Sequence, residues 1–101
     1  MQTIPLQAIP SQKVTAMLGG QKVDIALQQR TNGLYANIWL NGKMIMAGII
    51  CQNKNFIVNA PYKGLSGDLC FIDTQGKSDP DYSGLGSRFT LLWIEPGEQK
   101  P

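Results

Sequence analysis

Residues 13–27 read KVTAMLGGQKVDIAL, and this stretch decides the fold class. Apolar and polar side chains alternate on both sides of a central pair of glycines, Gly19 and Gly20. Alternation with a period of two puts one set of side chains on each face of a β-strand. Two glycines between such strands favour a two-residue hairpin turn, because that turn needs φ angles that other residues resist. The stretch therefore predicts an antiparallel hairpin with one apolar face.

The same pattern continues after this first hairpin. Asn32-Gly33 and Asn41-Gly42 are two further turn signals, followed by alternating or apolar segments at 34–40 and 43–51. Further strands are expected at 2–9, 56–58, 67–74 and 88–95. The predicted fold is all-β, a small single-domain barrel or two-layer sandwich of about seven or eight short, mostly antiparallel strands. This domain should cover residues 1–95, with a flexible C-terminal tail at 96–101.

Two segments indicate where they lie in a sheet. Residues 44–51 are apolar on both faces, which indicates either a central strand covered on two sides or a strand at an oligomer interface. In residues 2–9, Pro5 lacks the backbone N–H that a neighbouring strand needs. We therefore expect residues 2–9 at the edge of a sheet.

Composition limits the chain to one domain and excludes some partners. The chain has 101 residues, of which 43% are hydrophobic, and a net charge of +2. This charge is too small for a strong field around a polyanion, so nucleic acid is not an expected partner. The longest apolar run, residues 44–51, is far shorter than the roughly 20 residues that span a bilayer. The N-terminus also lacks the features of a signal peptide, so neither a membrane nor export is expected.

The two cysteines, Cys51 and Cys70, both lie in apolar, strand-like surroundings. A thiol in such a place behaves as a small hydrophobic group, so we expect two buried free thiols. A disulfide is the less favoured alternative in a chain without an export signal. Zinc is less favoured still, because the chain has no histidine to complete a site with two distant thiols.

The sequence offers little for catalysis. Without histidine, the chain lacks the commonest general base and the usual partner of a catalytic serine or cysteine. Asp68 and Asp73 flank one predicted strand, but their odd spacing points them to opposite faces, where we expect solvated strand ends. We therefore predict no catalytic residues, no cofactor and no enzymatic activity.

Residues 79–84 read DPDYSG, which matches the opening of a calcium-binding loop. Its first oxygen ligands would be Asp79, Asp81 and Ser83. The match then fails, because Thr90 stands where such a loop has a bidentate glutamate, and the flanking segments are predicted strands. A turn stabilised by an aspartate side chain explains the same residues. We predict no metal site, and a cation at this turn remains an open alternative.

The predicted strands carry aromatic side chains, among them Tyr35, Trp39, Phe71 and Trp93. Aromatic residues on a small barrel can stack on nucleic-acid bases when basic residues lie among them. The nearest same-face neighbours of Trp39 and Trp93 along their strands are not basic. Packing in the core or at a protein interface is therefore favoured. A small barrel that binds single-stranded nucleic acid or carbohydrate is the alternative function.

A long loop between the last two predicted strands, residues 74–87, carries the clearest functional signal. Loops of this length in a compact chain usually bind something, and this one lacks groups for catalysis. We predict that it binds a protein partner, with Tyr82 and Leu85 as apolar anchors. Asp79 belongs to the same predicted contact, and Arg88 at the border offers its forked guanidinium to a partner carboxylate.

Several stretches, in order along nearly the whole chain, resemble the small baseplate plug proteins of contractile-tailed bacteriophages of the cyanophage-like myovirus type. The strongest is DPDYSGLGSRF at 79–89. The others are IPL at 4–6, PSQ at 10–12, LGGQ at 18–21, TNGLY at 31–35, NG at 41–42 with Gly48 and Cys51, GLSGDL at 64–69 and FIDTQG at 71–76.

This resemblance implies a structural virion protein of the tail baseplate, assembled in the cytoplasm of the host bacterium. It implies several copies in each tail, packed among hub, spike and tube proteins. It brings no catalytic or ligand-binding residues with it, in agreement with the reading of the residues themselves.

Overall fold

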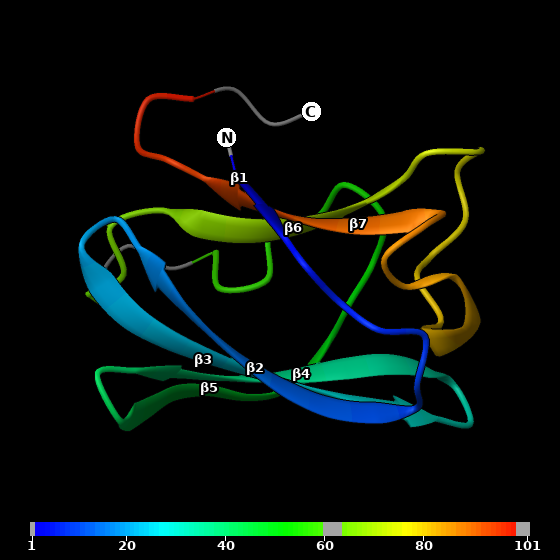
Figure 1. The fold of residues 1–101 in the computed structure, drawn as a ribbon, viewed down its shortest axis with the longest axis horizontal. Helices are drawn as coiled ribbons and strands as arrows, with labels where there is room; N and C mark the ends of the chain where they lie inside the picture. The colour runs from blue at the N-terminus through cyan, green and yellow to red at the C-terminus, as the bar shows by residue number, and fades with distance from the viewer. Residues whose placement is uncertain (1, 60–63, 99–101) are drawn as a thin grey trace.

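The computed structural model describes residues 2–59 and 64–98. Within these residues, seven strands form two antiparallel sheets that pack face to face, and neither sheet closes into a barrel (Figure 1). The predicted all-β fold is confirmed, and the sandwich is the form observed. The described part of the chain contains no helix long and apolar enough to cross a membrane.

The four-stranded sheet is the predicted meander, in the order β2-β3-β4-β5. Its strands are β2 (Ser11–Leu18), β3 (Gln21–Arg30), β4 (Gly33–Leu40) and β5 (Lys43–Ile50). Two-residue turns join β2 to β3 and β4 to β5 as predicted. The φ angles in these turns are positive, as a type I′ turn requires, at all four turn residues: Gly19, Gly20, Asn41 and Gly42.

The middle turn lies one residue earlier than predicted. Arg30 pairs with Gly33, so the turn consists of residues 31–32 and Gly33 begins β4. Gly33 has a φ of 151°, which is outside the range of a type I′ turn. A Cβ atom on Gly33 would lie 3.2 Å from Cδ1 of Ile50, so the glycine makes room for the neighbouring strand.

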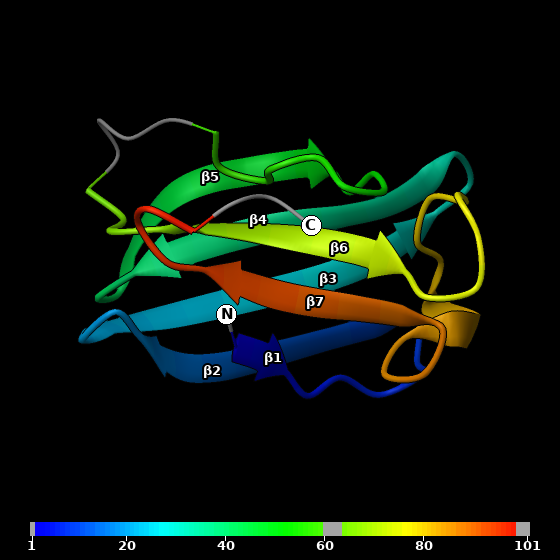
Figure 2. The same ribbon diagram turned by 90° about the horizontal axis from the view of Figure 1, so that it is seen from above.

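The second sheet contains three strands in the order β1-β7-β6. They are β1 (Gln2–Ile4), β6 (Asp68–Asp73) and β7 (Phe89–Ile94), so the strands predicted at 67–74 and 88–95 are found. The N-terminal strand is at an edge, as predicted, and ends immediately before Pro5. Figure 2 shows β1, β7 and β6 lying over β2, β3 and β4, which leaves β5 beyond the smaller sheet.

The core lies between the two sheets. Phe71, Leu91 and Trp93 come from the smaller sheet, and Ile25 and Ile38 come from the larger one. Each of these side chains is at most 1% exposed, so the alternation in the sequence correctly predicts the inner face of β3 and β4. The indole Nε1 of Trp93 is buried and has no hydrogen-bond partner among the described residues.

The predicted burial of both cysteines is confirmed. Cys51 is 1% exposed and belongs to the core between the sheets. Cys70 is 0% exposed and packs on the other face of β6, in a cluster with Leu92 and Ile94. Burial raises the pKa of the Cys51 thiol to about 12, because the charged thiolate is poorly solvated there.

The prediction of a central strand at 44–51 is wrong, because β5 is the edge strand of its sheet. Met46 and Ile49 pack against the core, while Met44 and Ile50 are 46% and 39% exposed. A strand with apolar residues on both faces therefore has only one face covered within the chain. The other reading, a strand at an oligomer interface, remains a prediction.

The predicted strand at 56–58 is also wrong. Only isolated bridges are found in this part of the chain, from Asn53 to Phe71 and from Phe56 to Cys70. The carboxylate of Asp68 accepts hydrogen bonds from the backbone N–H groups of residues 58 and 59, at 3.0 and 2.7 Å. The Asp68 side chain thus accepts bonds from backbone N–H groups that, in a strand, would bond to a neighbouring strand.

The predicted tail lies only partly within the described residues. At its start, the backbone N–H of Glu95 donates a 2.8 Å hydrogen bond to Oε1 of Glu98. Residues 99–101 lie outside the described residues. The predicted limits of the domain and of a flexible tail therefore remain predictions.

Candidate protein-binding loop

The loop between β6 and β7 is closed at its base by an ion pair. Asp73, the last residue of β6, accepts hydrogen bonds from Nε and Nη2 of Arg88, both at 2.8 Å. The same carboxylate accepts the backbone N–H groups of Gln75 and Ser78, both at 2.9 Å. The bond from Arg88 is the main cause that holds the pKa of Asp73 well below its usual range.

This arrangement bears on two predictions. Asp73 is only 8% exposed, so it is not the solvated strand end that the sequence suggests. Burial is tolerated because four donors satisfy the carboxylate and Arg88 balances its charge. The guanidinium fork of Arg88, expected to bind a partner carboxylate, is occupied by this internal pair.

The apex of the loop is held by one hydrogen bond within the loop and by two to other parts of the chain. Asp81 caps a single 3-10 turn (Tyr82–Gly84) by accepting the backbone N–H of Ser83 at 2.9 Å. Asp79 accepts the backbone N–H of Asn53 at 3.0 Å. The backbone N–H of Tyr82 donates to Oε1 of Gln29, a residue of β3, at 3.0 Å. The loop is thus fixed to two other parts of the chain.

These bonds bear on the calcium alternative. The aspartates at 79 and 81 act as acceptors for backbone donors, which is the turn-stabilising role that competed with a calcium loop in the sequence. Residues 2–59 and 64–98 contain no group of three or more histidine, cysteine, aspartate or glutamate side chains placed to hold a metal ion.

The four predicted contact residues differ in how they are placed. Leu85 is 3% exposed and belongs to the core, and Arg88 is bound to Asp73. Asp79 is exposed at the surface of the loop. Tyr82 is 38% exposed, although its backbone is fixed to β3. The structure therefore leaves Tyr82 and Asp79 accessible and gives Leu85 and Arg88 internal partners.

Gly86, the residue after the buried Leu85, lies where the loop passes close to Leu6. Gly86 has a φ of 81°, and a Cβ atom there would lie 2.4 Å from the carbonyl oxygen of Leu6. Its backbone N–H donates to the carbonyl oxygen of Phe89 at 3.1 Å. Both the left-handed conformation and the close approach to residue 6 require glycine at this position.

The sequence reasoning missed a second surface, which we call the outer sheet face. It is the side of the four-stranded sheet that points away from the three-stranded sheet. Lys13 Nζ lies 4.7 Å from the ring centroid of Trp39, and the guanidinium of Arg30 lies 5.3 Å from that of Tyr35. These basic partners come from other strands, so they do not appear among the neighbours along β4.

The comparisons with known proteins place the chain in a family. The family model described as cyanophage baseplate Pam3 plug gp18 matches residues 1–96. No curated protein matches the chain. Because the match covers nearly the whole chain, it includes both sheets and the loop between β6 and β7. The chain belongs to the cyanophage baseplate plug family, whose members are non-enzymatic structural components of the virion tail.

Proposed function

We propose that the loop at residues 74–87 is the element by which this plug protein binds a neighbouring protein of the baseplate, with Tyr82 as its apolar anchor. As a baseplate component, the chain associates with other baseplate proteins. We further propose that the tail contains several copies of the chain and that hub, spike and tube proteins surround them.

The observation that carries this proposal is the exposed ring of Tyr82 on a loop that is already fixed. Within the loop, the backbone N–H of Tyr82 donates to Gln29, Asp79 accepts the backbone N–H of Asn53, and the hydroxyl of Ser78 accepts a bond from Arg88. These bonds hold the shape of the loop within the free chain. A contact made by a preorganised loop loses little conformational entropy on binding. A partly exposed tyrosine is also a side-chain type that is common in the centre of protein interfaces.

The test is co-assembly of the chain with the hub, spike and tube proteins of the same phage. Tyr82→Ala should reduce incorporation strongly while the thermal midpoint changes little, because the ring is exposed. Gln75→Ala is the matched control, since this exposed side chain lies in the same loop and its backbone bond to Asp73 is retained. Normal incorporation of Tyr82→Ala would contradict the proposal.

A further inference from the structure

The outer sheet face combines exposed apolar side chains with positive charge. Met17, Met44 and Ile50 are 65%, 46% and 39% exposed, and they are three of the five large hydrophobic side chains exposed among the described residues. Met44 pairs with Trp39 and Ile50 pairs with Tyr35 in the register of β4 and β5. The apolar side of β5 thus continues into the partly buried aromatic residues of β4.

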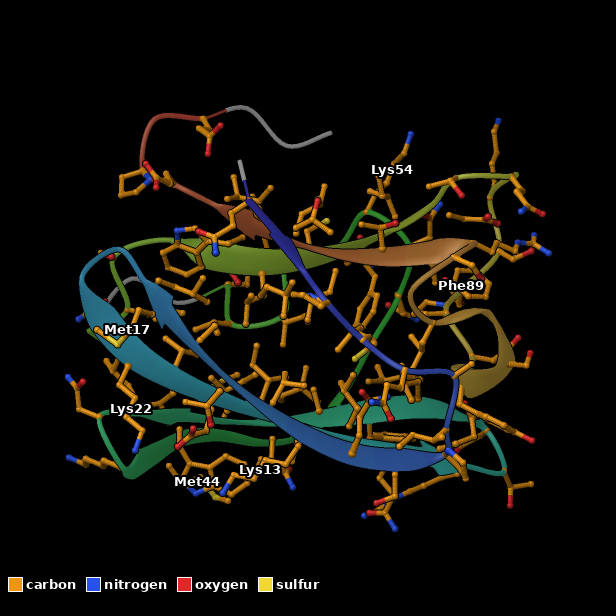
Figure 3. The ribbon with its side chains drawn as sticks, viewed as in Figure 1. Lys13, Met17, Lys22, Met44, Lys54 and Phe89 are labelled. Carbon is orange, nitrogen blue, oxygen red and sulfur yellow. The ribbon has the colours of Figure 1, made fainter. Side chains whose placement is uncertain are left out.

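All the exposed charges on these four strands are positive. Lys13, Lys22 and Arg30 lie on the outer sheet face, and Lys43 lies where β5 begins. Asp24 is the one acidic residue between 11 and 50, is only 7% exposed, and accepts a 2.5 Å hydrogen bond from Thr15. Figure 3 shows Lys13 and Met44 together on this face, with Lys22 nearer the β2–β3 turn.

The opposite charge is concentrated elsewhere in the same chain. Six of the seven acidic residues lie between 68 and 98. Asp73 is neutralised by Arg88, but Asp79 and Asp81 are exposed and both lie just before the Tyr82 anchor in the chain. The loop apex therefore presents an aromatic ring next to two exposed carboxylates, and the outer sheet face presents apolar side chains among cations.

We propose that the outer sheet face of one copy binds the 79–82 loop apex of a second copy of this chain. The inference rests on the proposed contact role of Tyr82 and names its partner. The ring of Tyr82 packs on the exposed apolar side chains of β5, and Asp79 and Asp81 face the lysines of β2 and β3. Opposite charges on the two patches select this pairing over others.

The charges also fix the kind of contact between copies. Packing of two outer sheet faces against each other is disfavoured, since the cations Lys13, Lys22 and Arg30 of one copy would meet the cations of the other. The contact is therefore heterologous, with a different patch from each copy, so that every copy has one patch of each kind to offer. Such a contact closes as a reciprocal pair or a larger ring, or continues as an open row.

Nucleic acid fits this face less well than a protein loop does. Base stacking needs open aromatic ring faces, and the rings of Trp39 and Tyr35 are already covered by Lys13 and Arg30. The exposed apolar contribution comes from methionine and isoleucine instead, which suits the packing of a protein side chain.

The first experiment measures self-association of the purified full chain by sedimentation velocity, up to about 1 mM, where weak contacts are populated. We expect concentration-dependent association that weakens between about 50 and about 500 mM salt, because the charges are exposed. Lys22→Glu should weaken association by about tenfold or more. Lys54→Glu makes the same change of charge at an exposed lysine on the opposite side of the molecule from the outer sheet face, next to Asn53, and should not weaken association (Figure 3).

The second experiment tests whether the contact is heterologous. Met44→Glu removes a functional outer sheet face, and Tyr82→Ala removes a functional loop. Each variant alone should be monomeric, and circular dichroism with thermal melting should show that each is folded. Their mixture should form a dimer that does not grow further, because only one intact pair of patches remains.

The results separate this inference from the proposed function. A wild-type chain that is monomeric at every salt concentration, or a mixture that stays monomeric while the wild type associates, overturns the contact between copies. Loss of Tyr82→Ala from assembled tails in that case leaves the role of the loop intact, with a different baseplate protein as its partner. Binding of a single-stranded oligonucleotide that Lys22→Glu abolishes would also overturn the inference.

Discussion

Asp73 and Arg88 meet through two parallel hydrogen bonds of 2.8 Å, which join the end of β6 to the residue before β7. The backbone and the hydroxyl of Thr74 both donate to the carbonyl oxygen of Arg88, at 2.8 and 2.7 Å. The two ends of the 74–87 loop are therefore clamped twice, once by side chains and once through the main chain. The loop keeps its shape without a partner.

The first prediction concerns pH. Arg88 lowers the pKa of Asp73 in the folded chain below the value of about 3.9 for an unfolded aspartate. The stabilisation is therefore complete above about pH 4 and is lost as the pH falls toward the folded pKa. Asp73→Asn should be less stable at pH 7 and should lose part of this acid dependence, as measured by thermal midpoints from pH 2 to 7.

Asp79→Asn is the control for this titration, because it removes a carboxylate from the same loop outside the ion pair. An acid dependence in Asp73→Asn equal to that of the wild type would show that the pair does not contribute to stability.

The second prediction concerns the thiols. Burial keeps Cys51 protonated at pH 8, with a pKa of about 12, and only the thiolate reacts readily with iodoacetamide. Cys70 is fully buried as well. Both should resist alkylation in the folded protein and react after unfolding in urea without reductant. Mass spectrometry distinguishes this outcome from a bridged peptide, which would contradict the predicted free thiols.

The third prediction compares two glycines with similar φ angles. Gly86 and Gly97 have φ of 81° and 87°, but only at Gly86 would a Cβ atom meet another residue, the carbonyl oxygen of Leu6. Gly97→Ala should cost about 1–2 kcal/mol of stability at most, the cost of a left-handed alanine. Gly86→Ala should cost clearly more in urea unfolding, and equal costs would mean that residue 6 moves aside freely.

The fourth prediction separates the two apolar residues of the loop. Leu85→Ala should reduce the free energy of unfolding by about 2–5 kcal/mol, because it leaves a cavity in the core. Tyr82→Ala should change it by less than about 1 kcal/mol, because the ring is partly exposed. Replacing residues 77–85 with a glycine-serine linker should therefore destabilise the chain, since it removes Leu85. A fully stable linker variant would contradict the core assignment.

The sequence predicts best what is local. The glycine and asparagine turns, with the period of two beside them, predict the four-strand meander, because two-residue hairpins are set by neighbouring residues. The order of strands in space is not local. Residues 44–51 are equally apolar whether another strand covers them or another molecule does, so β5 could not be placed from its composition alone.

The candidate site shows the same limit. The exposure of Tyr82 and Asp79 could be predicted, because they lie in a polar loop. The pairing of Asp73 with Arg88 could not, because these residues are fifteen positions apart and meet only through the pairing of β6 with β7. The cation over Trp39 comes from Lys13 of β2, two strands away, which pairs with Ala26 of β3. A pattern along one strand cannot show such neighbours.

The two tryptophans should give separate fluorescence signals for folding and for assembly. Trp93 is sealed in the core with an indole N–H that meets no acceptor among the described residues, so its fluorescence is that of an apolar site and shifts to the red on unfolding. Trp39 lies on the outer sheet face beneath Lys13. The proposed docking of a second copy would change its exposure while the core stays as it is. Emission at the blue edge should thus follow folding, and quenching of the half-buried Trp39 ring by iodide should follow the proposed assembly, in the unlabelled chain.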